Sequence, residues 1–274
     1  MISSSMIDPI LQQELRSRFN PDGSPLRRHQ LLMLDMLKKI DRICVENNIK
    51  YWLSSGTCIG ALRHGGFIPW DDDVDLEMLE DDFKKLRRVM RAYDGGDLVW
   101  QDSRSDFEYV QPFAKIRDTR SVIHEIPDTD RNYRYRGVFI DIFAIRPSGS
   151  LNLYKLGGKL QTFFLYRPQY IGNRFLRRAT IAFSRLLVTK GLLRLISLVD
   201  GLVSNGQYRH LPGTAFHRPR FKSDVVSTRL TKFEDTELPV PINAEHYLEQ
   251  IYGDFHKIPP LDSIVPHISD ISYK

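Results

Sequence analysis

Two aspartates, Asp73 and Asp75, stand two residues apart in a segment where acidic and apolar residues alternate from Asp73 to Met78. Alternation is the period of a β-strand, so both carboxylates are expected on one face, with Glu77 beside them. Like charges this close repel one another unless a cation lies between them. Oxygen ligands suit Mg²⁺ or Mn²⁺, and Mg²⁺ sites usually combine one or two carboxylates with substrate phosphates. The alternative is a solvated acidic edge strand with no ligand.

A third carboxylate, Asp141, interrupts an apolar run at residues 137–145 that is typical of a central strand. A lone carboxylate in a buried strand is costly unless a cation or hydrogen bonds satisfy it. We therefore predict that Asp73, Asp75 and Asp141 together hold a metal ion.

The segment before these acids carries groups that suit a phosphate. Ser55 and Thr57 offer hydroxyls, and Gly56 offers an accessible backbone amide. Arg63 supplies a fork-shaped cation that matches phosphate oxygens, and His64 fits a general base, a phosphate contact or a structural hydrogen bonder. Glycine loops with an arginine also occur in proteins that bind no phosphate. Together with the acids, these groups are typical of a metal site for phosphoryl or nucleotidyl transfer, and the sequence has no Walker glycine–lysine loop.

Helices and short strands are expected to position these groups. Apolar residues recur at helical spacing over 26–48, and a short buried strand at 51–53 leads into the hydroxyl-rich loop. The acidic strand runs into a second helix that opens at Glu80. The run at 137–145 supplies the central strand, and a terminal helix is predicted near 244–252.

The composition is that of an ordinary soluble globular protein, with 274 residues, a net charge of +5 and two cysteines. The positive charge favours anionic partners such as nucleotides, phosphorylated glycans or an anionic membrane surface, and we expect no nucleic-acid partner. Two cysteines are too few for a disulfide framework. Because the sequence has neither a secretory signal nor an apolar run of the roughly 20 residues that a spanning helix needs, we predict a cytoplasmic protein.

Four segments are predicted: a loosely attached lead-in at 1–25, a catalytic core at 26–150, a basic helical insert at 151–203 and the C-terminal part of the catalytic domain at 204–274. The insert is rich in Leu, Arg and Phe and contains a single acid, Asp200. Three interpretations of the insert stay open. In the first, the insert is a plain helical subdomain packed on the core. In the second, it is a peripheral membrane element that contacts the inner face of the membrane through 174–200. In the third, it forms an acceptor groove or an oligomer contact.

Three blocks of the sequence resemble the signature of the LicD family: GTCIGALRHGGFIPWDDDVDLEM, KIRDT at 115–119 and GVFIDIF at 137–143. This family also includes the fukutin-type transferases and is a branch of the nucleotidyltransferase superfamily. The resemblance implies an α/β fold, with a nucleotidyltransferase-like mixed sheet flanked by helices. It also implies metal ligands at Asp73, Asp75 and Asp141. Gly56 and Thr57 then stand where the superfamily holds donor phosphate.

Members of this family move a phospho-alcohol, such as phosphocholine or ribitol phosphate, from a CDP-activated donor to a sugar hydroxyl. The resemblance therefore implies a Mg²⁺- or Mn²⁺-dependent phosphotransferase with a CDP-alcohol donor and a glycan or lipid-linked glycan acceptor. The product would belong to a cell-surface glycan such as lipopolysaccharide, capsule or teichoic acid. Ser55 and Arg63 join the donor-phosphate contacts, and Asp71, Asp72 and His64 are candidates for activating or orienting the acceptor hydroxyl.

Glu77 stands where a glycine is frequent in the family, and as a fourth carboxylate on the metal face it would change the metal or donor preference. Two rival functions use the same residues. A nucleotidyltransferase in the strict sense would transfer a nucleoside monophosphate from a triphosphate and release pyrophosphate. A non-catalytic glycan- or nucleotide-binding protein would keep the fold without the reaction, and the intact acid triad argues against it.

Overall fold

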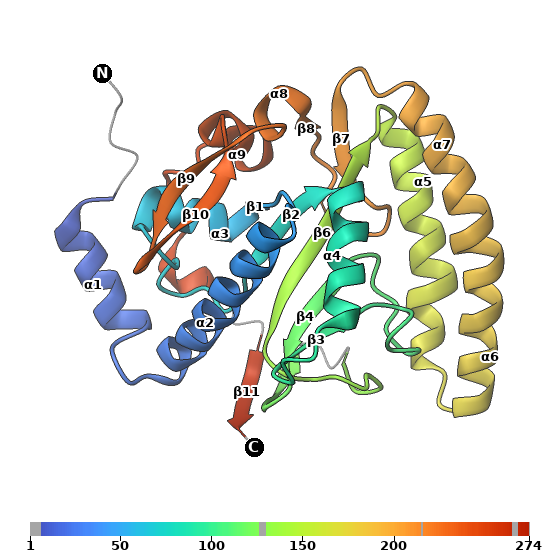
Figure 1. Ribbon diagram of the computed structural model, residues 1–274, viewed down its shortest axis with the longest axis horizontal. Coiled ribbons are helices and arrows are strands. Elements are labelled where there is room, and N and C mark those ends of the chain that lie inside the picture. Colours follow the sequence, from blue (N-terminus) through green and yellow to red (C-terminus); the bar gives the residue numbers. More distant parts are fainter. Residues whose placement is uncertain (1–6, 126–129, 215, 265–267, 274) are drawn as a thin grey trace.

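The computed structural model describes residues 7–125, 130–214, 216–264 and 268–273 (Figure 1). Its helices are α1 (Pro9–Phe19), α2 (Pro25–Glu46), α3 (Ser55–Ile59), α4 (Glu80–Ala92), α5 (Leu151–Gln161), α6 (Arg174–Ser184), α7 (Leu193–Leu202), α8 (Lys222–Val225) and α9 (Ala244–Tyr252). Tighter or wider helical turns are η1 (Gly60–His64), η2 (Thr162–Tyr166), η3 (Arg167–Tyr170), η4 (Arg185–Leu192) and η5 (Leu261–Ser263). Its strands are β1 (Trp52–Leu53), β2 (Asp75–Leu79), β3 (Leu98–Gln101), β4 (Ala114–Asp118), β5 (Ser121–Glu125), β6 (Phe139–Pro147), β7 (Gln207–His210), β8 (Arg220–Phe221), β9 (Thr228–Phe233), β10 (Thr236–Pro241) and β11 (Ile268–Tyr273).

A mixed sheet forms the centre of the molecule, with strand order β1-β2-β6-β4-β3 and with β7 and β8 continuing beside the end of β6. β2 runs parallel to β6, whereas β4 and β7 run antiparallel to it. Asp75 lies opposite Asp141 across the first pair, and Lys115 lies opposite Asp141 across the second. Directly opposite residues share a face of a sheet, so all three side chains point to the same side. The predicted mixed α/β fold is confirmed.

The other face of this sheet is apolar and builds the core. Leu76 on β2 and Ile142 on β6 alternate with the acids, and both are fully buried. α2 and α4 pack on this face, and α2 contributes side chains at helical spacing such as Met33 and Leu37. Ser24 caps the start of α2 with its hydroxyl. The sheet is therefore held from one side by helices and presents its polar residues on the other.

Residues 151–203 form helices that stand beside the sheet (Figure 1). α5 continues into η2, where the Arg167 N–H donates to the Thr162 carbonyl across a wide, five-residue turn. α6 then packs against η2 and η3, and η4 and α7 return along α5. Asp200, the only acid of this segment, is buried near its end and accepts the Ser150 N–H at 2.6 Å. This contact joins the two ends of the insert.

The lead-in is attached to the core more firmly than predicted. Residues 9–19 form α1, whose Gln12 side chain bonds His64 at 2.5 Å. Phe19 at the end of α1 packs edge-on against Trp70, with ring centroids 5.4 Å apart. The prediction of loose attachment is therefore wrong for the described part of this segment. In the described ranges, no helix is both long and apolar enough to cross a membrane.

Candidate active site

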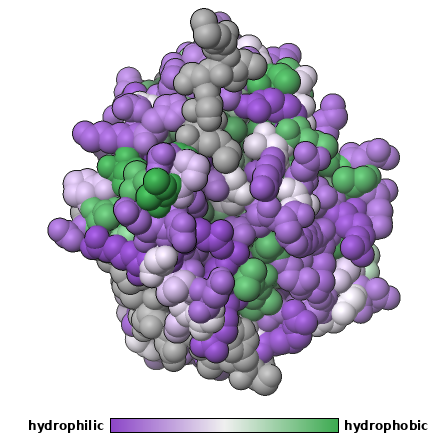
Figure 2. Space-filling model, turned by 90° about the vertical axis from the view of Figure 1, so that its left-hand side faces the viewer, coloured by the Kyte–Doolittle hydropathy of each residue, from purple (hydrophilic) through white to green (hydrophobic). Residues whose placement is uncertain are grey.

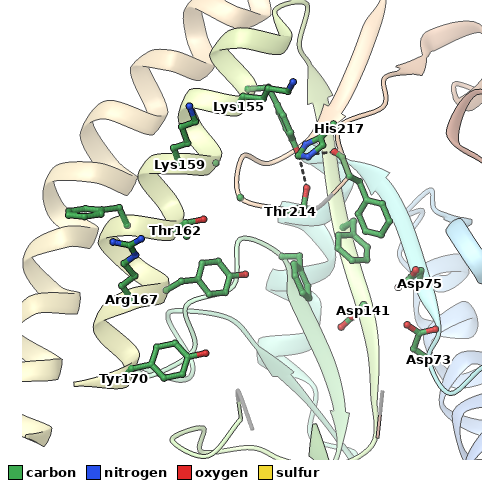
Figure 3. A pocket seen from close by; sticks show the side chains of 18 residues that line it. Asp73, Asp75, Asp141, Lys155, Lys159, Thr162, Arg167, Tyr170, Thr214 and His217 are labelled. Carbon is green, nitrogen blue, oxygen red and sulfur yellow. Dashed lines mark hydrogen bonds between the residues drawn. The ribbon is translucent and has the colours of Figure 1, made fainter. Parts of the chain in front are cut away.

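A cavity of about 1070 Å³ lies between the polar face of the sheet and the insert (Figure 3). Asp73, Asp75 and Asp141 line its sheet side, so the structure brings the three predicted metal ligands together. The insert lines the other side with basic residues, among them Lys159 and Arg167. Of the three interpretations of the insert, the wall of a groove is the one that this arrangement supports, and membrane contact stays a prediction.

Backbone hydrogen bonds fix the positions of these carboxylates. β2 begins at Asp75, not at Asp73 as predicted, because the ladder with β6 starts at that residue. The Asp75 N–H donates to the Thr57 hydroxyl at 2.9 Å, and the Asp141 N–H donates to the Val74 carbonyl at 2.9 Å. Thr57 therefore positions Asp75, which links the predicted phosphate loop to a predicted metal ligand.

Burial and mutual repulsion raise the free energy of the ionised carboxylates. Burial raises the Asp75 pKa well above its ordinary value, and the charges of Asp73 and Asp141 raise it further. Burial also raises the Asp141 pKa to about 6, although Lys115 opposes the shift. A divalent cation between the carboxylates would relieve this repulsion. The all-oxygen donor set of Asp73 and Asp75 fits such a cation, either Mg²⁺ or Mn²⁺.

Lys115 already holds one oxygen of Asp141. Its ammonium lies 2.9 Å from Asp141 Oδ1 and 3.1 Å from the centre of the Phe139 ring. In the part of the chain that the structure describes, no three acidic, His or Cys side chains surround a common metal position. A carboxylate has a second oxygen, so Asp141 can still contribute to a metal site. Asp73 and Asp75 are the ligands that the arrangement favours.

Two buried cations on β4 belong to this site and were not among the predicted residues. Lys115 and Arg117 are only 3% and 0% exposed, so each needs an anionic partner. Glu125 on β5 lies 3.8 Å from Lys115 and accepts a 2.5 Å bond from Arg117. The signal in the sequence is the alternation within the KIRDT block, which places two cations on one face of a strand. This network fixes the Lys115 ammonium beside Asp141.

The predicted phosphate loop adjoins the carboxylates through the bond between Thr57 and Asp75, but Ser55, Gly56 and Thr57 are not among the described residues that line the cavity. Ser55 has a φ of 48°, which is uncommon for a residue other than glycine. A Cβ on Gly56 would come within 2.9 Å of the Asp71 carboxylate, so glycine allows that acid to approach the loop. The Asp72 carbonyl bonds the His29 ring at 2.8 Å. Asp71 and Asp72 are not among the described residues that line the cavity, and their action on the acceptor stays a prediction.

Arg63 and His64 also lie outside the lining of the cavity, and their assignment as donor and acceptor contacts stays a prediction. Arg63 donates to the carbonyls of Phe255 and Lys257 at 2.6 and 3.3 Å, and to His64 Nε2 at 2.9 Å. The other ring nitrogen of His64 bonds Gln12 of α1. Burial, followed by the Arg63 charge, lowers the His64 pKa to about 3, so the ring is neutral. Both side chains tie peripheral segments to the core.

Glu77 is unavailable to a metal, although it shares the Asp75 side of β2 as predicted. It is fully buried, and its Oε1 accepts from Arg220 Nη2 and His210 Nε2, both at 2.6 Å. Trp52 donates to the other oxygen at 3.2 Å. Burial alone would raise the Glu77 pKa, but Arg220 and His210 outweigh it and hold the pKa well below its usual range. The predicted effect on metal preference is therefore wrong, because these partners already neutralise the carboxylate.

The chain matches a known protein family over its central part. Residues 48–153, which include the three aspartates and the predicted phosphate loop, match the family model described as LicD/FKTN/FKRP, nucleotidyltransferase domain. The chain is 28% identical to the lipopolysaccharide cholinephosphotransferase LicD of Haemophilus influenzae, over 88% of this chain and 95% of that protein. It is 38% identical to the human ribitol 5-phosphate transferase FKRP over 23% of this chain and 14% of that protein. The resemblance predicted from the motifs is therefore confirmed: residues 48–153 are similar to the nucleotidyltransferase domain of the LicD family.

Proposed function

We propose that the chain is a phosphotransferase that moves a phosphocholine-like group from a CDP-activated donor to a sugar hydroxyl of a cell-surface glycan precursor, of the lipopolysaccharide, capsule or teichoic acid type. The observation that carries this proposal is the cluster of Asp73, Asp75 and Asp141 inside a cavity of the LicD-type domain. One relative that aligns with most of the chain is named a lipopolysaccharide cholinephosphotransferase, and another is named a ribitol 5-phosphate transferase. These names support phosphotransfer to a glycan.

The sheet side of the cavity suits the transfer of a charged group. Asp73 and Asp75 would hold Mg²⁺ or Mn²⁺, which neutralises charge on a diphosphate when bound. Thr57 keeps Asp75 in place through its backbone amide. Lys115 balances the charge of Asp141, so that this buried carboxylate is ionised without a second metal ion. The carboxylates therefore present a fixed, negatively charged surface to a cation and the donor phosphates it carries.

The insert side of the cavity supplies the opposite charge. Lys155, Lys159 and Arg167 line it on the wall opposite the carboxylates (Figure 3). Among the described residues no ion pair is formed by these three cations, although Arg167 lies 5.3 Å from the centre of the Phe163 ring, so their charges can meet phosphate oxygens. At about 1070 Å³ the cavity is slightly larger than the roughly 300–1,000 Å³ of most small-molecule sites. It thus offers room for a donor and an acceptor sugar together.

A panel of CDP-choline, CDP-ethanolamine, CDP-ribitol and CDP-glycerol tests the reaction. We expect Mg²⁺-dependent release of CMP from at least one donor, since water can replace the acceptor in a slow hydrolysis, and we expect a chelator to stop it. Pyrophosphate release from a nucleoside triphosphate, without CMP release from any CDP donor, would favour the strict nucleotidyltransferase. Metal-independent binding of CDP ligands without turnover would favour a non-catalytic protein.

The proposal includes contact between residues 174–200 and the inner face of the membrane. Among the described residues, 15 of the 23 exposed large apolar side chains lie between residues 151 and 203. On α6 and α7, Phe175, Leu195 and Leu198 are 84%, 60% and 63% exposed. The opposite end of the molecule is mostly hydrophilic, with small separate apolar patches (Figure 2). Exposed apolar side chains on a helix suit the boundary between lipid headgroups and acyl chains.

Charge favours a lipid surface over a second copy of the chain as the partner of this face. Arg174, Lys190 and Arg194 are exposed among the apolar side chains, while Asp200, the one acid of the insert, is buried. A two-fold dimer through this face would bring the same basic residues of both copies together, and their like charges would repel one another. Anionic lipids attract them, by about 1 kcal/mol for each basic residue near the surface.

Leu195→Glu combined with Leu198→Glu is expected to reduce binding to anionic vesicles several-fold in a flotation assay, because it adds two charges to the apolar face. Wild-type protein should float with anionic vesicles and much less with zwitterionic ones. Leu230→Glu is the matched control, since Leu230 is 65% exposed on β9 outside the insert. Equal partitioning of the wild-type and doubly substituted proteins would contradict membrane contact through this face.

A further inference from the structure

The cations of the insert wall are spread along one row of the helix. Lys155, Lys159 and Arg167 line the cavity on this wall, and residue 167 follows residue 155 by 12 positions. A helix rises about 1.5 Å per residue, so the two ends of the row lie about 18 Å apart along its axis. A diphosphate is far shorter, because one bridging oxygen joins its two phosphorus atoms. A single donor diphosphate therefore does not account for the whole row.

The Arg167 end of the row belongs with the carboxylates. In Figure 3, Arg167 lies at the level of the three aspartates. The hydroxyl of the neighbouring Tyr166 donates to the Gln111 side chain, shortly before β4. β4 carries Lys115, which pairs with Asp141. Arg167 therefore stands opposite the position that we propose for the metal ion and the donor phosphates.

The Lys155 end of the row is built against a different segment of the chain. Tyr154, the residue before Lys155, is 2% exposed. Because a hydroxyl has one hydrogen, the Tyr154 hydroxyl donates to the Phe216 carbonyl at 2.9 Å and accepts from the Thr214 hydroxyl at 2.6 Å. His217 follows, with its ring centroid 6.1 Å from that of Tyr154. These contacts fix His217 beside the first turn of α5.

The lysine end of the cavity, lined by Lys155, Lys159 and His217, carries groups that suit an anion. Figure 3 shows all three above the level of the aspartates. Those aspartates are the only acids among the described residues that line the cavity, and they lie at the other end. An ammonium binds phosphate or carboxylate oxygens as a compact point charge, and an imidazole N–H can donate to them. The lysine end therefore fits an anionic group better than a neutral one.

We propose that Lys155, Lys159 and His217 bind an anionic group of the acceptor glycan, a phosphate or a carboxylate that stands apart from the accepting hydroxyl. This inference rests on the proposed phosphotransfer and names the class of its acceptor. The accepting hydroxyl has to reach the donor phosphate near the aspartates, and the sugar then fills the space between the two ends of the row. The donor's cytidine at the lysine end is the competing explanation, but cytidine is uncharged and would leave both ammonium groups without an anion.

Lys155→Gln combined with Lys159→Gln tests the anion site by calorimetry with trehalose 6-phosphate, glucuronate and neutral trehalose. The wild type is expected to bind at least one of the two anionic sugars about tenfold more tightly than trehalose, and the double variant should lose about tenfold with that sugar. Its affinity for trehalose should change less than about twofold. Lys222→Gln combined with Lys232→Gln is the matched control, because it removes the same charge at exposed positions outside the cavity and should change none of these affinities.

Equal affinities for anionic and neutral sugars would overturn the inference, and so would an equal loss in the control variant, which indicates general attraction to a basic surface. A loss with Arg167→Gln and none with the lysine variant would place the sugar anion in the donor-phosphate position. An equal loss of CDP-choline binding in the lysine variant would assign the lysines to the donor. Both of these results contradict an acceptor site.

Turnover separates the inference from the reaction on which it rests. With a donor that releases CMP, the anionic sugar should accelerate release more than trehalose does, and the ratio of the two kcat/KM values should fall about tenfold in the lysine variant. If no CDP donor releases CMP, the proposed phosphotransfer fails. The calorimetric comparison of the sugars then still decides whether the anion site exists.

Discussion

Asp75→Asn is expected to lower CMP release from the preferred CDP donor by about a thousandfold or more, because a metal ligand supplies several kcal/mol of charge stabilisation and each 1.4 kcal/mol is tenfold in rate. The fold should persist, since the bond from the residue 75 amide to Thr57 does not involve the side chain. Asparagine also removes a buried charge that Asp73 and Asp141 repel. The melting temperature should therefore stay unchanged or rise while activity is lost.

Asp73→Asn should show the same loss of activity, which steady-state assays of CMP release would measure. Asp81→Asn is the matched control, because the Asp81 side chain is 97% exposed on α4 and should be replaceable without effect. The metal assignment fails if Asp75→Asn retains turnover within about tenfold of the wild type. It also fails if both asparagine variants unfold, since the loss of activity would then have a structural cause.

Glu77→Ala is expected to destabilise the protein by about 3–5 kcal/mol at neutral pH, since it leaves the buried Arg220 guanidinium without its anion and the buried His210 ring without its hydrogen-bond acceptor. The effect should depend on pH in a defined direction. Arg220 and His210 hold the folded-state pKa of Glu77 below the ordinary value of 4.5. The stability that the carboxylate contributes is therefore fully present above pH 4.5 and is lost as the pH falls toward the folded-state pKa.

Urea unfolding of the wild type and the Glu77→Ala variant, at neutral pH and again well below pH 4.5, measures both parts of this expectation. The difference between the two proteins should shrink in acid. Glu237→Ala, at an exposed position on β10, should change stability by less than about 0.5 kcal/mol. A difference under about 1 kcal/mol for Glu77→Ala at neutral pH would show that the buried cluster contributes little.

Local sequence patterns predicted the elements that carry the acids. The alternation in β2 and the apolar run in β6 indicated two strands, and the period of two placed Asp73 and Asp75 together. The position of Asp75 opposite Asp141 depends instead on the parallel register of β2 and β6. No local pattern contains that register; the prediction that Asp141 joins the other two acids came from the cost of a lone buried carboxylate and from the LicD resemblance.

The sequence did not predict partners that are distant along the chain. Glu77 has the same strand phase as Asp75, but its partner Arg220 lies 143 residues further along the chain. Arg63 looks like a phosphate contact by residue type, yet it bonds the Phe255 carbonyl 192 residues away. The type of a residue indicates that its charge needs a partner in the folded protein. It does not indicate which residue that partner will be. For the same reason, helical spacing predicted the insert as helical without showing which of its faces turns toward the carboxylates.

The insert wall of the cavity follows a repeat of four residues. Two rows line it, Lys155, Lys159, Phe163 and Arg167 in one and Gly158, Thr162, Tyr166 and Tyr170 in the other. A regular α-helix turns by about 100° per residue, so a four-residue repeat drifts by about 40° at each step. The wide turn at η2 underwinds the helix and offsets part of this drift. The cavity side of the insert therefore depends on the rotation of the helix from residue to residue. Removing one residue from η2 would turn Arg167 and Tyr170 by about 100° about the helix axis, away from the carboxylates.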